Sequence, residues 1–364
     1  MSRPRIDVLV RGDRDTPSVR IILQTLSHLD ERWDVHLKPI RRPDLTGRNI
    51  LVSAIELSIL SARTLLTAFR LRTKPDILLI NKTLPREPLG WITRIPIPEH
   101  LFVGFHTTVY STMDADYVWN PRAASLLFEK ADLIYATSRA IYDEATEYAS
   151  EDRVVLLPPS VDTDFFTPDV DVPERLDDEN LVIGWIGGAD NHGETLRHLV
   201  RCLEDVPPAG ITVRLLLGGG SLPDGVEEGL RKAGFEVDVI EYVPWESVPA
   251  VTNSIDVGLV PLRDTPFDRG KSSQKVREYM ACGIPVVASN VGENRHIVPE
   301  DGGILVDDPA GWGEAVQTLR DDEELRQTMG ENARAYVEET CAIPVVAAAL
   351  EAEFERLVDR ETDS

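Results

Sequence analysis

The chain has 364 residues, of which 42% are hydrophobic and 27% are charged, a composition that excludes collagen-like, disordered and membrane-embedded proteins. Its 38 Lys and Arg against 62 Asp and Glu give a formal net charge of −24, which argues against nucleic-acid binding through a basic surface. The length predicts two domains, because one domain usually takes about 100 to 200 residues.

Strand-length and helix-length segments alternate through the first part of the chain. Near-continuous apolar strands that alternate with helices indicate a parallel sheet covered on both faces. The pattern predicts a doubly wound, Rossmann-like α/β domain over residues 1–165. Its strands are expected at residues 6–10, 33–37, 76–80, 101–105, 132–137 and 154–158.

Positive charge gathers between Lys38 and Lys74, where the local balance is +6. Glu56 and Arg63 interrupt the apolar run in this segment, so it is shorter than the roughly 20 residues of a membrane span. The segment predicts an amphipathic helix. Either the helix packs on the sheet with its arginines in solvent, or it forms a basic surface that meets anionic lipid or a lipid phosphate.

The alternation stops over residues 158–179, where prolines and acidic residues without periodicity indicate a linker, and then resumes. A second Rossmann-like domain is expected over residues 178–341, and one long helix at 342–360 that can pack back on the first domain. Ligands of such sheets bind outside the carboxyl ends of the strands, so the site is expected in a cleft between two facing domains. The second set of strands is expected at residues 181–187, 213–218, 236–243, 256–262, 284–289 and 303–306.

A dense set of polar groups lies in the segment DRGKSSQKVREYM. Gly270, Ser272 and Ser273 stand where a helix is expected to begin, and a helix N-terminus offers unpaired N–H groups and a positive dipole end to a phosphate. Lys271 and Lys275 add cationic donors. This segment therefore predicts a phosphate site.

Lys275 and Glu278 share one face of the expected helix, at spacing i and i+3. Glu278 could accept hydrogen bonds from a ribose while the lysines neutralise a diphosphate, and phosphate with ribose means a nucleotide. The same spacing also fits an ordinary ion pair on a helix surface.

The stretch RGKSSQKVREYMACGIPVVASNVGENRHIV, followed by DGGILVDDPAGW, resembles the donor-nucleotide region of the group 1 glycosyltransferases, family 4. Proteins of this family have the GT-B architecture of two facing Rossmann-like domains. Further similar stretches occur in the same order, namely DTPSVRI, ADLIYATSRAIYDEA, PPSVDTDFFTP, LVIGWIGG and EYVPWESVPAVTNSIDVGLVPL. The resemblance implies a retaining, hexosyltransferase-type enzyme that moves a sugar from a nucleotide-sugar donor to a glycan or lipid-linked acceptor.

By position, the resemblance implies that Glu278 holds the donor ribose and that Lys275 binds the diphosphate. Lys271 matches an arginine, glycine, lysine element of one subgroup, whereas Gly270 stands where many members carry a glutamate. This departure leaves the usual contact to the donor sugar in question. Positioned cations would stabilise the leaving diphosphate, so neither a metal nor a cofactor is expected.

The segment GWIGGADNHGE lacks the basic residues that the family often carries after this strand. The backbone N–H groups of Gly187 and Gly188, with Asn191 or His192, are expected to bind the donor instead.

The resemblance assigns the acceptor to the first domain. His106 is expected at the carboxyl end of the strand 101–105, as a catalytic residue or as a structural histidine. Asp114 and Asp116 are expected to form an acidic cluster of the acceptor site without a metal. Arg20, at the start of the first helix, could reach the diphosphate or the acceptor, or could be solvated.

Two other functions remain open: a sugar-nucleotide epimerase of the same fold, and a noncatalytic sugar-nucleotide-binding subunit. Neither a signal-peptide run after Met1 nor a disulfide or zinc pattern among Cys202, Cys282 and Cys341 is present. The expected location is the cytoplasm or the inner membrane face, and the expected pathway is the assembly of a surface polysaccharide or a glycoprotein glycan.

Overall fold

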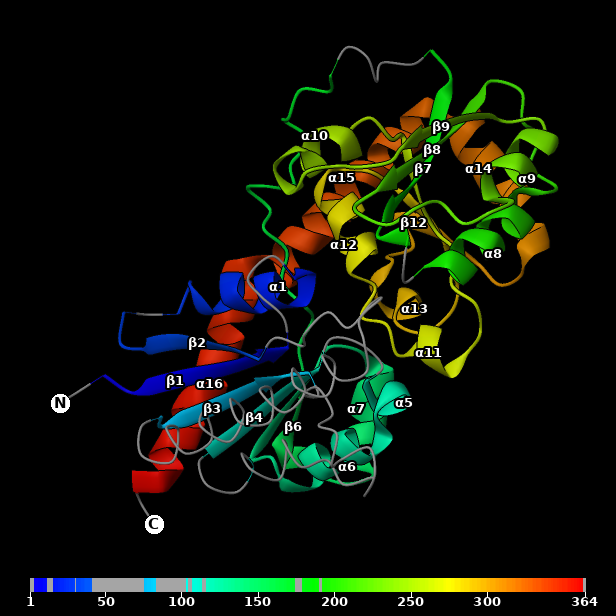
Figure 1. Ribbon diagram of the computed structural model, residues 1–364. Coiled ribbons are helices and arrows are strands. Elements are labelled where there is room, and N and C mark those ends of the chain that lie inside the picture. The colour runs from blue at the N-terminus through cyan, green and yellow to red at the C-terminus, as the bar shows by residue number, and fades with distance from the viewer. Residues whose placement is uncertain are drawn as a thin grey trace, which may run out of the picture. The chain divides into compact units, whose positions relative to one another are not determined.

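The computed structural model describes residues 3–11, 16–29, 31–40, 75–82, 103, 107–112, 116–173, 179–189 and 192–362. The chain divides into two compact units, each built on one sheet with flanking helices (Figure 1). The first unit comprises Met1–Ser160, Gly270–Ser272 and Ile343–Ser364, and the second comprises Val161–Arg269 and Ser273–Ala342.

The first unit contains a six-stranded sheet in the order β2-β1-β3-β4-β5-β6, and its neighbouring strands pair in parallel. The strands are β1 (Arg5–Arg11), β2 (Asp34–Ile40), β3 (Ile77–Asn81), β4 (Thr107–Thr112), β5 (Leu133–Ala136) and β6 (Val154–Leu156). The helices are α1 (Pro17–Leu26), α5 (Asp116–Trp119), α6 (Pro121–Lys130), α7 (Arg139–Thr146) and α16 (Ile343–Thr362).

Helices cover both faces of this sheet. Alternate residues of β1 and β3 face α1 and α16, where Phe354 meets Trp33 with ring centroids 5.8 Å apart. The intervening residues face α6 and α7, where Phe128 packs against Tyr110. The C-terminal helix α16, red in Figure 1, therefore completes the core of the first unit.

The fourth strand differs from the sequence prediction. The sequence did not predict β4, Thr107–Thr112, a largely polar run whose residues are all buried, and the expected strand 101–105 lies outside the described residues except for residue 103. The hydropathy pattern missed this strand because threonine is polar, although its branched side chain fits a strand well. Hydrogen bonds to residues distant in sequence stabilise its burial: Asp132 Oδ2 accepts from the N–H of Thr108 at 2.7 Å, and the carbonyl of Thr112 accepts from the hydroxyl of Thr137.

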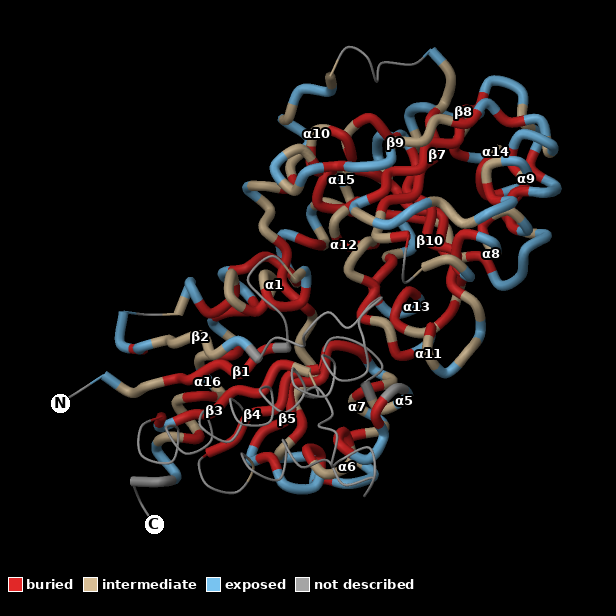
Figure 2. Tube along the Cα trace, viewed as in Figure 1, coloured by how far each residue is buried: buried red, intermediate tan, exposed pale blue. Residues whose placement is uncertain are grey.

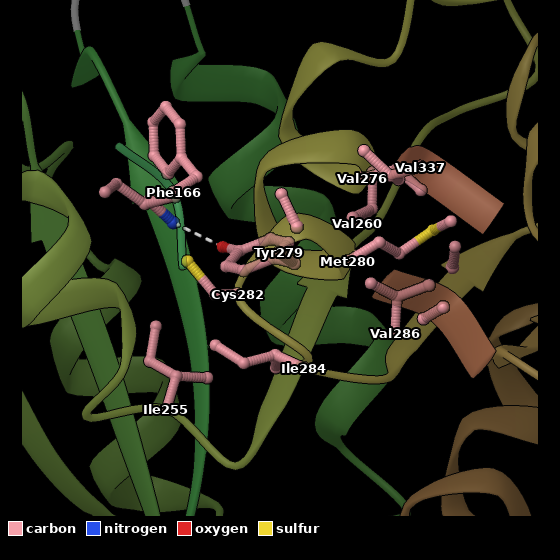
Figure 3. Packing of buried hydrophobic residues seen from close by; sticks show 14 of the residues in the cluster. Phe166, Ile255, Val260, Val276, Tyr279, Met280, Cys282, Ile284, Val286 and Val337 are labelled. Atoms are coloured by element: carbon pink, nitrogen blue, oxygen red, sulfur yellow. Dashed lines mark hydrogen bonds between the residues drawn. The ribbon is translucent and has the colours of Figure 1, made fainter. Parts of the chain in front are cut away.

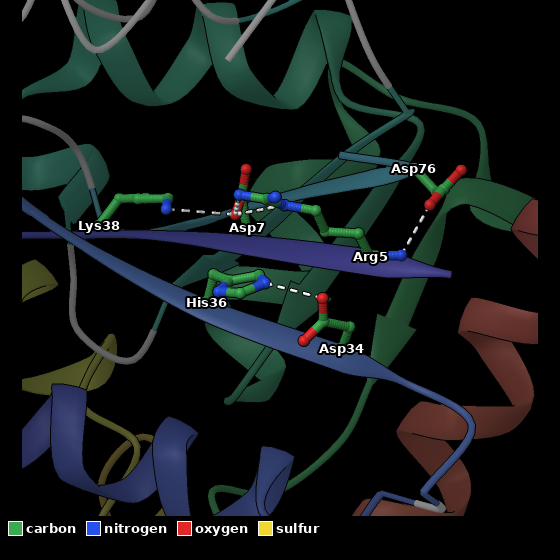
Figure 4. A network of polar contacts seen from close by, with 6 residues as sticks. All are labelled: Arg5, Asp7, Asp34, His36, Lys38 and Asp76. Carbon is green, nitrogen blue, oxygen red and sulfur yellow. Dashed lines mark hydrogen bonds and ion pairs between the residues drawn. The ribbon is translucent and has the colours of Figure 1, made fainter. Parts of the chain in front are cut away.

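A charged group is buried between β1 and β2 (Figure 4). The carboxylate Oδ1 of Asp7, which is fully buried, accepts from Arg5 Nε at 3.1 Å and Nη2 at 3.0 Å, and Lys38 Nζ lies 3.7 Å away. Two cations thus compensate one buried carboxylate.

The second unit also has a six-stranded parallel sheet, in the order β12-β11-β10-β7-β8-β9. The strands are β7 (Leu181–Gly187), β8 (Ile211–Leu217), β9 (Glu236–Ile240), β10 (Val257–Val260), β11 (Val286–Ser289) and β12 (Gly303–Val306). The helices are α8 (Gly193–Leu203), α9 (Val226–Lys232), α10 (Val248–Thr252), α11 (Pro266–Arg269), α12 (Gln274–Ala281), α13 (Asn294–Ile297), α14 (Trp312–Asp321) and α15 (Glu323–Thr340).

Two apolar layers enclose this second sheet, whose strands β8, β10 and β11 are buried throughout (Figure 2). One layer packs α8 and α14 on the sheet around Trp185 and Trp312. The other packs α10, α12 and α15 around Tyr279, Met280 and Val337 (Figure 3). The two doubly wound parallel sheets confirm the fold class predicted from the sequence.

Within the described ranges, no helix combines the length and the apolar character needed to cross a membrane. All three cysteines, Cys202, Cys282 and Cys341, are free and buried, and all lie in the second unit.

Candidate functional site

The strand order of the second sheet reverses between β7 and β10. β10 pairs with β7 only through Val257 with Ile183 and Gly258 with Gly184, whereas β8 follows β7 as far as Gly187. Where the strand order reverses, the segments that follow two adjacent strands lead to opposite sides of the sheet and leave a crevice at the carboxyl ends of these strands. Ligands of doubly wound sheets bind in this crevice. A ligand site is therefore expected at the carboxyl end of β7.

Tyr279 of α12 takes over as hydrogen-bond partner where β10 leaves β7 (Figure 3). Its hydroxyl accepts from the N–H of Ile186 at 2.8 Å and donates to the carbonyl of Gly184 at 3.3 Å. Burial raises the pKa of Tyr279, so the hydroxyl remains a donor. Gly258 makes room for the ring, since a Cβ there would lie 2.6 Å from it. These contacts hold α12 against the end of β7.

Lys275, one turn before Tyr279, reaches over the carboxyl end of β7. A Cβ on Gly187 would lie 2.6 Å from Lys275 Cε and 3.0 Å from Nζ, so the lysine passes directly over this glycine. Its Nζ lies 5.2 Å from the ring centroid of Trp185 and 3.3 Å from Nε2 of His192. His192, the residue before α8, meets Trp185 edge to face with centroids 5.7 Å apart.

These four residues, Trp185, Gly187, His192 and Lys275, form what we term the Lys275 cluster. The lysine comes from the helix layer that contains Tyr279, yet its ammonium group contacts Trp185, which belongs to the opposite apolar layer. An ammonium group held at a switch point by an aromatic face and an imidazole is suited to bind an anion.

Glu278 lies on α12 at spacing i+3 from Lys275 and is half-buried. Its Oε1 accepts from Gln274 Nε2 at 3.3 Å, which connects the first and second turns of the helix. A carboxylate in this position can accept hydrogen bonds from a diol.

The turn before α12 has a strained backbone at Ser273, whose φ of 54° lies in the left-handed region that serine seldom adopts. Its Oγ donates to Asn294 Oδ1 at 2.7 Å, and Asn294 Nδ2 donates to the carbonyl of Ser289 at 3.0 Å. Because the hydroxyl of Ser273 donates to Asn294, it holds the turn against α13. A phosphate at this turn would therefore be bound by backbone groups.

Gly270, Lys271 and Ser272 precede Ser273 in the same turn. Gly270 and Ser272 are buried, and Lys271 is half-buried. Gly188 follows β7, and a Cβ there would meet nothing within 4 Å.

Asp268 and Arg263, which the sequence analysis did not single out, organise the loop between β10 and α12. The fully buried Asp268 accepts through Oδ2 from Arg263 Nε at 2.8 Å and from the Arg263 N–H at 3.3 Å. Arg263 Nη1 also lies 3.6 Å from Glu194 Oε2. Gly270 stands where many members of the resembled family carry a glutamate, and Asp268 is the carboxylate closest to it in sequence. Because Asp268 is hydrogen-bonded to Arg263, it stabilises the loop and does not take the place of that glutamate.

Several of the predicted site residues belong to the first part of the chain or to the loop after β7. Asn191, His106, Asp114 and the basic segment 41–74 lie outside the described residues, and Asp116 begins α5 with a side chain that is not described. In the sequence His106 precedes β4, which begins at Thr107, and the strand 101–105 that it was predicted to follow falls, apart from residue 103, outside the described residues. Arg20 lies in the first turn of α1 and is half-buried.

The first sheet reverses its order between β1 and β3, and two polar residues missed by the sequence analysis lie near that point. Asn81 ends β3 and pairs in register with Ser111 of β4. Asn81 Nδ2 donates to the carbonyl of Ser18 in α1, while Asn81 Oδ1 and Ser111 Oγ are buried without a hydrogen-bond partner among the described residues. A polar residue at the end of an apolar strand is the sequence signal that could have identified Asn81.

Across the part of the chain that is described, no three or more His, Cys, Asp or Glu side chains gather in a way that could hold a metal ion. The cation at the switch point is supplied by Lys275.

Residues 180–322 match the family model described as Glycosyl transferases group 1. D-inositol 3-phosphate glycosyltransferase of Corynebacterium efficiens is 30% identical over 228 residues, which are 57% of this chain and 52% of that protein. The protein of the same name from Xylanimonas cellulosilytica is 31% identical over 225 residues, 56% of this chain and 52% of that protein. The chain thus spans about half the length of the curated relatives it matches.

Solved structures share the fold over nearly the whole chain. Sucrose-phosphate synthase of Thermosynechococcus elongatus superposes with a TM-score of 0.73 at 18% identity, over 98% of this chain and 100% of that one. HepE of Anabaena in complex with UDP and glucose gives 0.71 at 15% identity, over 97% and 100%. The fold is therefore GT-B, as the sequence predicted, and residues 180–322, which match the group 1 glycosyltransferase model, contain the Lys275 cluster.

Proposed function

We propose that the chain is a retaining glycosyltransferase that binds the diphosphate of a nucleotide-sugar donor at the Lys275 cluster. The observation that carries this proposal is the ammonium group of Lys275, which lies over Gly187 at the point where β7 and β10 separate. Anionic groups of ligands bind at this place in doubly wound sheets. HepE of Anabaena, which shares the fold, was solved with UDP-glucose, and this supports a nucleotide-sugar donor.

The chemistry follows from the charge that develops during transfer. Breaking the bond between the anomeric carbon and the diphosphate leaves a cationic sugar and an anionic leaving group. Lys275 stabilises the leaving group because it is already in place, and Trp185 and His192 keep its ammonium oriented. The leaving phosphate then accepts the proton of the acceptor hydroxyl, and the sugar keeps its anomeric configuration. This route requires neither a metal nor a cofactor.

Glu278 is proposed to hold the donor ribose. It lies one turn along α12 from Lys275, on the same face, so a ribose and a diphosphate can be bound by one helix.

Glu278→Ala tests the donor site. A thermal-shift panel of UDP-, GDP-, dTDP- and ADP-glucose identifies the donor, whose dissociation constant is then measured by calorimetry. The variant should weaken donor binding by about 1.5–3 kcal/mol, the scale of hydrogen bonds to a charged group. Glu314→Ala, an exposed glutamate of α14, is the matched control and should bind the donor like the unmodified chain. An unchanged affinity in Glu278→Ala would remove the ribose assignment.

We propose that the acceptor binds at the first unit. Two chemical classes of acceptor are candidates. The sequence resemblance favours a glycan or lipid-linked acceptor, for assembly of a surface polysaccharide or a glycoprotein glycan. The relatives named D-inositol 3-phosphate glycosyltransferase favour a phosphorylated polyol. Labelled donor incubated with inositol 3-phosphate, or with membrane lipid extract, shows which of them receives the sugar.

The labelled-donor assay also distinguishes glycosyl transfer from the two other functions, a sugar-nucleotide epimerase and a noncatalytic sugar-nucleotide-binding subunit. Label that appears only in an isomerised nucleotide sugar would identify an epimerase. Donor binding without hydrolysis or transfer would identify a noncatalytic subunit. We propose a cytoplasmic location, with a peripheral contact to anionic membrane through residues 38–74.

A further inference from the structure

Lys275 and His192 form an unusual pair, because both are basic and yet they are in contact. Lys275 Nζ lies 3.3 Å from His192 Nε2. An ammonium group has only donors, so Nε2 must accept, and the imidazole is then neutral with its proton on Nδ1. The site without a ligand therefore favours a neutral histidine, since a second positive charge at this distance would repel the first.

The charges around the Lys275 cluster bear on how a diphosphate is neutralised there, and the nearest other lysine in sequence is the half-buried Lys271 in the turn before α12. The diphosphate of a nucleotide sugar carries two negative charges. On α8, Glu194 is paired with Arg197 at 2.7 Å, and on the loop after β10, Arg263 is paired with the buried Asp268. These arginines already face carboxylates, and Glu278 on α12 adds a negative charge. Within the Lys275 cluster only Lys275 carries a permanent positive charge.

We propose that His192 takes up a proton from solvent when the donor binds and so becomes the second cation of the diphosphate site. This inference rests on the proposed function. Without the donor, the ammonium group of Lys275 disfavours the protonated form of His192. A diphosphate bound beside Lys275 favours that form, because its negative charges attract the positively charged imidazole. Imidazole is the side chain whose ordinary pKa, about 6.5, allows this change near neutral pH.

The sign of the pH dependence follows from linkage. If the complex holds one more proton than the free protein, donor binding tightens as pH falls. The dissociation constant should rise by up to about tenfold per pH unit between pH 6 and pH 8. Carboxylates and lysines ordinarily titrate outside this interval, near 4 and above 10.

Calorimetry with UDP-glucose at pH 7, in buffers of different ionisation enthalpy, counts the protons taken up on binding. UDP-glucose is the right probe because both of its phosphates are esterified or bridged. The terminal phosphate of UDP would itself titrate near pH 6 and mask the effect. Whichever of GDP-, dTDP- or ADP-glucose binds more tightly replaces it. The expected result is net uptake approaching about one proton per donor bound.

Three variants assign the proton. His192→Gln removes the titratable group, so uptake should vanish and affinity should lose its pH dependence. His192→Lys carries a permanent charge, and its affinity should also be flat with pH but as tight as that of the unmodified chain at pH 6. His198→Gln is the matched control on the same helix, since the ring of His198 is half-buried and its pKa is lowered by burial and by Arg201 and Arg263. It should keep the full uptake.

The outcomes separate this inference from the proposed function. If no nucleotide sugar of the panel binds at any pH, both are wrong. Binding without proton uptake would overturn the role of His192 and leave the donor site standing. Uptake that persists in His192→Gln would assign the proton to another group and overturn the inference as well. Circular dichroism of each variant establishes that the fold is retained.

Discussion

At the scale of single residues, Gly187 determines where the cation of the site lies. A side chain at this position would displace the lysine, because a Cβ would lie 2.6 Å from Lys275 Cε and 2.9 Å from the Trp185 ring. Its backbone is not in the left-handed region, so the requirement is for space and not for conformation. The lysine can cross the end of β7 only because this glycine is there.

Gly187→Ala should therefore move Lys275 away from the switch point while the fold is retained. The donor dissociation constant should rise by about 10- to 100-fold, the loss of one charge-assisted hydrogen bond. A double-mutant cycle with Lys275→Ala checks the cause: in that background the glycine change should add little. Additive effects in the cycle would show that Gly187 acts through something other than Lys275.

At the scale of elements, α12 joins the sheet to the site. Tyr279 and Lys275 stand one turn apart, so the hydrogen bonds that fix Tyr279 to Ile186 and Gly184 also fix the lysine's starting point. The helix is short, Gln274–Ala281, and begins at a strained Ser273 held by Asn294. Its position depends on these tertiary contacts more than on helix propensity.

Tyr279→Phe should leave the buried N–H of Ile186 without its partner. The free energy of unfolding should fall by about 1–3 kcal/mol, and donor affinity should fall with it because α12 is less firmly placed. Urea unfolding and donor titration measure the two effects. Tyr242→Phe, which removes an exposed hydroxyl of the same unit, should change neither. Equal stability in the two variants would show that the Tyr279 hydroxyl does not secure α12.

At the scale of the whole molecule, the two units have separate cores. The last helix of the chain, α16, supplies Leu350, Phe354 and Leu357 to the core of the first unit. All three cysteines lie in the second unit. Burial raises the pKa of both Cys202 and Cys282 to about 12, so these thiols are protonated as well as inaccessible at pH 8.

Phe354→Ala should destabilise the first unit by about 3–5 kcal/mol, because it leaves a cavity between α16 and the sheet. Hydrogen exchange should rise in β1 and β3 but not in β7 and β10. Reaction of Cys202 and Cys282 with a thiol reagent at pH 8 should stay as slow as in the unmodified chain. Thiols that become reactive together with the increased exchange would show that the two units unfold as one.

Local pattern in the sequence determined the fold class and most of the elements. Strands such as β7 and β12 were predicted residue for residue, because buried parallel strands are continuous apolar runs. β4 was not predicted, because its buried threonines and serine read as polar, whereas its burial is stabilised by partners distant in sequence such as Thr137, whose hydroxyl donates to the backbone carbonyl of Thr112.

The sequence alone also marked Lys275, Glu278 and the glycines after β7 as candidates, through their spacing and a family resemblance. Only the tertiary structure decided that Lys275 meets His192, 83 positions away, and that the buried Trp185 also faces the lysine. It likewise showed Asn81 and Ser111 side by side at the end of the first sheet. The periodicity of apolar residues in a sequence indicates which face of a helix or strand is buried. A ligand site instead forms where the ends of separate helices and strands lie close together, and which ends lie together depends on the order of the strands in the sheet.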